Sequence, residues 1–134
     1  DVGDFSSIIN CPSDAFDRAT KTLAERVAKG GQQWAAVWLA GQDAVFANCS
    51  PKLAQEQRNQ KPLVRPLVLP PALPAKAPDW LKKDHAYQRA AAHFYAGRYE
   101  DARTQFLAVG QDAASPWQPL GKYLAARSLI TAVI

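Results

Sequence analysis

The chain has 134 residues, of which 48% are hydrophobic and 21% charged, a composition typical of a folded domain rather than a disordered segment. Its formal net charge is +4, but the lysines and arginines are scattered and form no dense basic run, which argues against nucleic-acid binding. The sequence contains no run of 18 apolar residues, so we expect no insertion into a membrane.

Residues 1–50 predict an N-terminal helical hairpin. Ser13 is suited to cap a helix, apolar residues recur after it at helical spacing, and Gly30-Gly31 is expected to end that helix. The next run, residues 32–49, is apolar around most of its circumference, which is typical of a helix buried between neighbours. Because the intervening turn is short, the two helices should pack antiparallel.

Residues 51–78 form a proline-rich linker in this interpretation. Seven of the ten prolines of the chain lie here, and each removes a backbone donor and disfavours helix in the residue before it. The segment should therefore be extended and lie along an apolar groove as a strap between helical units. Its stretch "PALPAK", residues 71–76, also fits one orientation of proline-rich ligands, although an intramolecular strap is the better explanation.

Residues 79–134 return to a helical pattern. Gly97 and Gly110 are expected to end two successive helices. A third helix should begin with Ser115 as its cap and Pro116 at its first position, where the missing N–H costs nothing. No closing signal follows its last turn, so we expect the pattern to continue past residue 134 in a longer protein.

Two stretches of this last region resemble the tetratricopeptide repeat, a 34-residue helical hairpin. In "FYAGRYEDARTQF", an alanine and a phenylalanine match the A-x3-F pair of the second helix, and the glycine and following tyrosine fit the turn. In "WQPLGKYL", the spacing resembles W-x2-L-G-x2-Y of a first helix, with leucine at the tyrosine position. The matching residues, which the resemblance assigns to repeat packing, are Gly97, Tyr99, Ala102, Phe106, Trp117, Leu120, Gly121 and Leu124.

The resemblance covers residues 84–134 and implies an all-α fold of antiparallel hairpins stacked as a short tetratricopeptide-like solenoid. In such a fold small residues let helix backbones approach, and large apolar residues fill the space between hairpins. First-helix side chains would then face a protein or peptide partner. The candidate partner-binding residues are Arg89, His93, Lys122 and Arg127.

The only two cysteines, Cys11 and Cys49, flank the predicted N-terminal hairpin. In an antiparallel hairpin both lie at the same end, so they are candidates for a disulfide that would stabilise the fold by roughly 3 to 4 kcal/mol. Such a bridge would place the protein in the periplasm or outside the cell. The alternative is a pair of reduced cysteines packed as small apolar residues.

The sequence offers no catalytic, cofactor-binding or metal-binding set. Neither His85 nor His93 has a nucleophile or paired carboxylate nearby in sequence, and neither cysteine has a second ligand at metal-binding spacing. The adjacent Glu100 and Asp101 are explained by the dipole of the helix that they begin.

These observations favour a non-enzymatic repeat module that binds a protein or peptide within a larger exported protein. The alternative is a helical scaffold of a larger enzyme, such as a lytic transglycosylase acting on the cell wall, with its catalytic residues outside this chain. A third hypothesis is a structural piece of a multiprotein complex in which the proline-rich strap makes the contact.

Overall fold

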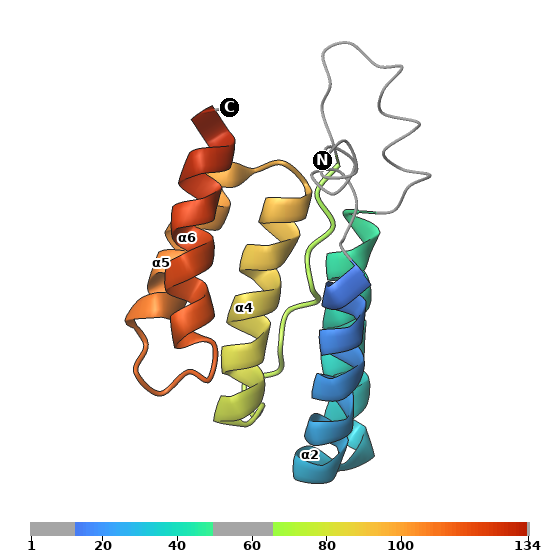
Figure 1. The fold of residues 1–134 in the computed structure, drawn as a ribbon. Coiled ribbons are helices and arrows are strands. Elements are labelled where there is room, and N and C mark those ends of the chain that lie inside the picture. The colour runs from blue at the N-terminus through green and yellow to red at the C-terminus, as the bar shows by residue number, and fades with distance from the viewer. Residues whose placement is uncertain (1–12, 50–65, 134) are drawn as a thin grey trace.

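The computed structural model describes residues 13–49 and 66–133, and these residues form a packed all-helical fold (Figure 1). Within those two ranges there is no strand, so the predicted all-α class is confirmed. Among the described helices, α4 packs on α2, α5 on α4 and α6 on α5, and none is long and apolar enough to cross a membrane. The helices are α2 (Ser13–Ala47), α4 (Asp79–Tyr95), α5 (Tyr99–Gln111) and α6 (Gln118–Val133).

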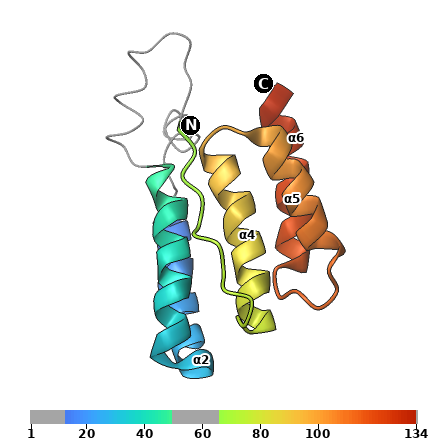
Figure 2. The same cartoon turned by 180° about the vertical axis from the view of Figure 1, so that it is seen from behind.

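Helix α2 is a hairpin, because its helical conformation is interrupted at Gly31. The φ and ψ angles there are 73° and 177°, a combination that glycine adopts readily and residues with a side chain rarely do. Residues 13–30 run in one direction and residues 32–47 return beside them, as both views show (Figures 1 and 2). The Gly30-Gly31 turn therefore lies where the sequence places it.

Residues 66–78, the described part of the predicted linker, run extended between α2 and α4 (Figure 2). The side-chain amide of Asn48 pairs with the backbone of this segment. Its Oδ1 accepts the N–H of Val68 at 2.9 Å, and its Nδ2 donates to the carbonyl of Val68 at 2.8 Å. Farther along, Nε2 of His85 lies 2.9 Å from the carbonyl oxygen of Pro71. Residues 51–65 of the predicted linker lie outside the described ranges.

Helix α4 ends in a Schellman motif that turns the chain into α5. Gly97 has a φ of 81°. The N–H of Arg98 donates to the carbonyl of His93 at 2.8 Å, and the N–H of Gly97 donates to the carbonyl of Phe94 at 3.0 Å. Because the motif satisfies the last carbonyls of α4, α5 can begin at Tyr99 without a longer loop.

The core depends on small residues at the helix contacts. Ala90 and Ala102 are fully buried beside Phe106, which is 1% exposed. Helix α6 approaches α5 where two glycines meet: a Cβ added to Gly121 would lie 2.8 Å from the backbone nitrogen of Gly110. Backbones this close leave no room for a side chain at either residue.

Helix α6 begins later than the sequence analysis expected. Ser115 accepts the N–H of Trp117 at 3.1 Å, so its side chain stabilises a turn, but the first helical residue is Gln118 rather than Pro116. The turn is continued by an N–H···O bond from Gln118 to the carbonyl of Ser115 at 3.2 Å. The prediction that Ser115 caps a helix beginning at Pro116 was therefore wrong: Ser115 stabilises the turn before the helix, and the helix begins two residues later, at Gln118.

Candidate functional site

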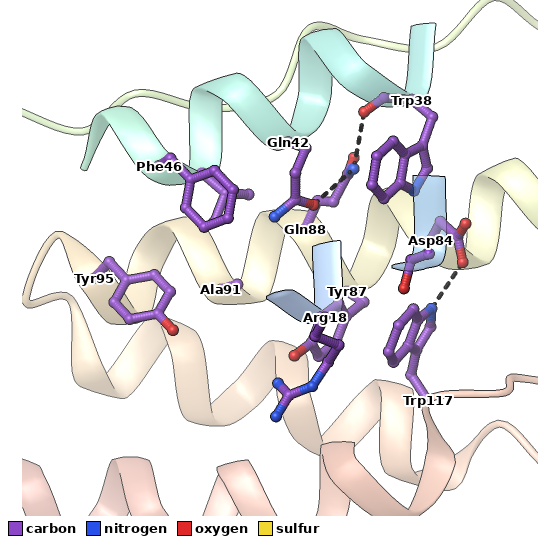
Figure 3. A pocket seen from close by; sticks show the side chains of 12 residues that line it. Arg18, Trp38, Gln42, Phe46, Asp84, Tyr87, Gln88, Ala91, Tyr95 and Trp117 are labelled. Atoms are coloured by element: carbon purple, nitrogen blue, oxygen red, sulfur yellow. Dashed lines mark hydrogen bonds between the residues drawn. The ribbon is translucent and has the colours of Figure 1, made fainter. Parts of the chain in front are cut away.

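A buried carboxylate joins three parts of the fold. Asp84 of α4 is 1% exposed and accepts two bonds from the guanidinium of Arg26, one from Nε and one from Nη2 at 3.1 Å. Its Oδ1 also accepts the indole N–H of Trp117 at 2.7 Å (Figure 3). The first half of α2, the middle of the fold and the chain entering α6 are therefore held by one side chain.

Aromatic stacking surrounds this carboxylate. The rings of Tyr87 and Trp117 are parallel within 9°, with centroids 4.4 Å apart. The guanidinium of Arg26 also lies over the Trp80 ring, 5.9 Å from its centroid. We infer that Arg26 and Trp117 are fixed in place by both hydrogen bonds and ring contacts.

Next to Asp84 lies an interior pocket between α2 and α4 (Figure 3). Its free volume is about 50 Å³, which suits a few water molecules and not an organic ligand. Gln88 crosses it and donates to the carbonyl of Trp38 at 3.1 Å and to Oε1 of Gln42 at 3.3 Å. Burial raises the pKa of Tyr87 on its wall to about 12. Its described lining contains no serine, cysteine or histidine.

Two larger hollows lie on the surface of the fold and share Lys83 and Ser115 in their walls. We call them together the basic groove. The first hollow, of about 400 Å³, runs between α4 and α5 and has Arg89 and Gln105 on its rim. The second, of about 570 Å³, lies between Trp80, the hairpin and the chain that joins α5 to α6. Each hollow is within the size range of ligand sites.

The charges of the basic groove are only partly neutralised. Lys83 is paired with Asp112, with Nζ 2.8 Å from Oδ2. The Lys83 ammonium, and after it the N–H of Ala114, lower the pKa of Asp112 below its usual value. Lys29 in one hollow and Arg89 in the other have no acidic partner among the described residues. Among the described residues, each hollow of the groove therefore contains a cation without an acidic partner.

The four residues predicted to bind a partner do not form one surface. Arg89 is exposed and lines the basic groove. His93 is only 6% exposed, with Nδ1 2.8 Å from the carbonyl oxygen of Arg89, so it presents little surface to a partner. Lys122 and Arg127 are exposed on α6, and neither lines the groove.

The residues that the resemblance assigns to repeat packing lie at the contacts of α4, α5 and α6. Tyr99 packs edge-on against Phe94, with ring centroids 5.4 Å apart. Leu124 packs on the core from α6, while Leu120 is half-buried. The others in this set are Gly97 in the turn, the buried Ala102, Phe106 and Gly121, and Trp117 against Tyr87.

The sequence analysis did not identify Asp84 or Arg26. A signal for Asp84 was nonetheless present, because it falls on the same helical stripe as Leu81 and Gln88, both buried. A carboxylate on a buried stripe requires a partner. The sequence does not say which of the sixteen basic residues supplies it, and Arg26 lies 58 positions away.

Cys49 is buried at the end of the hairpin, and no cysteine in the described ranges is free. Cys11 lies outside those ranges, so the pairing of Cys11 with Cys49 stays a prediction. The described residues also contain no group of histidine, cysteine or acidic side chains that could hold a metal ion.

Comparisons with known proteins give no relative from which a function could be transferred. No family model matches the sequence, and neither the curated proteins nor the solved structures yield a match. The function has to be argued from the groove and the surface of the fold.

Proposed function

We propose that this chain is a non-enzymatic helical module that binds an extended, acidic segment of another protein in the basic groove. The observation that carries the proposal is the pair of adjoining open hollows, of which one is lined by Lys29 and the other by Arg89. Neither cation is paired within the described residues. An anionic ligand would supply the missing partners, and a ligand spanning both hollows would reach both charges.

The walls of the groove suit a peptide. Ala86, Ala108 and Val109 provide apolar surface in the first hollow, and Gln105 provides a polar side chain that can bond to a backbone. Trp80 provides an aromatic wall in the second hollow. An extended peptide alternates its side chains between two sides, so acidic residues could meet the rim while small apolar residues lie on the floor.

The test is the binding of a fluorescein-labelled peptide of alternating glutamate and alanine, followed by fluorescence anisotropy. We expect the double variant Lys29→Glu/Arg89→Glu to weaken binding by on the order of tenfold or more. Asp112→Asn should strengthen it, because that change releases Lys83 from its ion pair. Affinity should also fall as salt is added, since the charges are exposed.

Arg103→Glu is the matched control, because Arg103 is exposed on α5 and does not line the groove. It changes the net charge by the same amount as Lys29→Glu or Arg89→Glu alone, and it should leave binding of the peptide almost unchanged. The proposal fails if a peptide with lysine in place of glutamate binds equally well. It fails also if Arg103→Glu weakens binding as much as Arg89→Glu.

The repeat arrangement and the location of the protein belong to the same proposal. We interpret α4 and α5 as one tetratricopeptide-like hairpin and α6 as the first helix of the next. The stacking of Tyr87 on Trp117 supports this interpretation, because it joins α4 to the residue directly before α6. An exported location, periplasmic or extracellular, is proposed with the Cys11–Cys49 bridge.

A further inference from the structure

Helix α6 has two opposed faces, and only one of them packs on the other described helices. The inner face contains Gly121, Ala125 and Ser128, which recur at helical spacing and are buried against the neighbouring helices. In both views α6 lies at the edge of the helix array (Figures 1 and 2). Its other face is therefore not covered by any described helix.

The outer face carries an apolar stripe. Tyr123 is 58% exposed and Ile130 is 59% exposed, and these two residues lie two helical turns apart. Pro119 and Ala126, both exposed, complete the stripe with successive spacings of four, three and four residues. This is the a/d spacing of a helix that packs lengthwise on another helix. We call these four residues the outer seam.

Basic residues flank the outer seam on both sides. On a helical projection Lys122 lies on one side and Arg127 on the other, at the g and e positions of the same heptad register. Both are exposed, and neither has an ion-pair partner among the described residues. Charges at these positions select the partner of a helix pair.

The geometry points to the outer seam of α6 as a docking site for an amphipathic helix of another protein, one that flanks its apolar stripe with Asp or Glu. Charge decides against a second copy of this chain, because α6 contains no acidic residue and self-pairing would bring Lys122 and Arg127 of two copies together. Leu129, 49% exposed beside Ile130, widens the apolar surface near one end of the seam, while Lys122 and Arg127 flank its middle, where acidic residues of a partner helix would meet them.

This site is separate from the basic groove, since no residue of the outer seam or its two flanks lines either hollow. Its partner is helical, whereas the partner proposed for the groove is extended. Either proposal can therefore fail while the other holds.

The test uses the full chain and two synthetic heptad-repeat peptides that share leucine at a and d. One peptide carries glutamate at e and g, and the other carries lysine. Titration calorimetry should show binding of the glutamate peptide at least about tenfold tighter than that of the lysine peptide. Lys122→Glu/Arg127→Glu should reverse this preference, and Ile130→Glu should abolish binding of both.

Two controls separate the seam from general effects. Arg103→Glu, at an exposed position of α5 outside both proposed sites, should bind the glutamate peptide as the unmodified protein does. Circular dichroism should show that Ile130→Glu remains helical, which is expected because Ile130 is already exposed.

Three outcomes would overturn the inference. One is failure of both peptides to bind the folded protein. Another is a dimer in sedimentation that Ile130→Glu dissociates while neither peptide binds, which would identify a second copy as the occupant. The third is binding to vesicles containing anionic lipid that Lys122→Glu/Arg127→Glu abolishes while neither peptide binds, which would identify a membrane surface.

Discussion

The carboxylate of Asp84 lies where a charge is tolerated only because it is fully paired. Replacing it by asparagine keeps the shape and an acceptor for Trp117, but leaves the guanidinium of Arg26, whose side chain is 12% exposed, with only its longer contact to the exposed Glu25, 3.9 Å from Nη1 to Oε2. We expect Asp84→Asn to lower the free energy of unfolding by roughly 3 to 5 kcal/mol. Urea denaturation followed by tryptophan fluorescence measures this change.

Asp79→Asn is the control for Asp84→Asn. Asp79 is an exposed acid in the first turn of the same helix, so its loss should cost less than about 1 kcal/mol through the helix dipole. If the two variants were equally stable, the pairing of Asp84 with Arg26 and Trp117 would contribute no more to the free energy of unfolding than an exposed acid does.

Tyr87 should make stability fall at alkaline pH. Burial raises its pKa from 10 to about 12, so between these values the unfolded chain releases a proton that the folded chain keeps. Ionisation then favours the unfolded state, and the stabilising effect of the neutral tyrosine, present below pH 10, is lost as pH rises towards 12. The contribution over this range is roughly 2 to 3 kcal/mol.

The comparison that isolates Tyr87 uses two phenylalanine variants. Tyr87→Phe should lose stability less steeply than the unmodified protein between pH 10 and about 12, measured from urea midpoints. Tyr123→Phe should behave as the unmodified protein does, because Tyr123 is 58% exposed. Equal pH profiles for the two variants would show that Tyr87 ionises normally.

The predicted bridge between Cys11 and Cys49 has a direct chemical test. A thiol reagent added to the unfolded, unreduced protein should find no reactive cysteine, because both sulfurs would be in the disulfide. After reduction the same assay should find two. Two reactive thiols before reduction would refute the bridge and remove the main argument for an exported location.

At the scale of single residues, the positions that require a small residue could be predicted from the sequence. The contacts between residues far apart in the sequence could not. The roles of Gly97 and Ala102 follow from local spacing and resemblance alone. The bond from Trp117 to Asp84 joins residues 33 positions apart, and no local pattern encodes such a contact. Polar contacts between distant segments become visible only when the packing of the helices is known.

Among the helix contacts, that of α5 with α6 depends most on the absence of side chains. In Gly121→Ala the new Cβ would lie 2.8 Å from the nitrogen of Gly110, 2.9 Å from Val109 Cγ1 and 3.0 Å from the carbonyl oxygen of Phe106. Two of these are backbone atoms, so the helices must separate. The better helix propensity of alanine recovers at most about 1 kcal/mol.

We therefore expect Gly121→Ala to destabilise the fold by a net 1 to 3 kcal/mol, roughly the range for overpacked contacts. Thermal unfolding by circular dichroism measures it. Ala126→Ser, on the exposed side of the same helix, is the control and should change stability by less than about 0.5 kcal/mol. A stable Gly121→Ala variant would mean that α6 can shift on α5 without cost.

Helix boundaries could be predicted where glycine determines them. Gly31 and Gly97 both have positive φ and both were expected to end helices. The start of α6 was misplaced, because the side chain of Ser115 can accept the N–H of Trp117 both at the start of a helix and in a turn. Pro116 is compatible with both, so the sequence alone did not decide between them.

At the scale of the whole molecule, one core cluster includes residues from all four helices of the described ranges. Val45 of α2, Ala91 of α4, Phe106 of α5 and Ala125 of α6 belong to it. The sequence predicted the N-terminal hairpin and the C-terminal helices as separate regions joined by a linker. It did not predict that they share a core, because apolar periodicity shows that a face is buried and not what buries it.

The shared core predicts that the hairpin and the C-terminal helices unfold together. Hydrogen exchange measured at increasing urea should show peptides from α2 and from α4 losing protection at the same concentration, since Asp84 and the Val45 contacts link them. In Asp84→Asn both transitions should move to lower urea and stay coincident, because the core contacts remain. If α2 lost protection first while α4 and α5 stayed protected, the hairpin would be an independent unit, and the wall that Arg26 and Lys29 contribute to the basic groove would be able to detach from it.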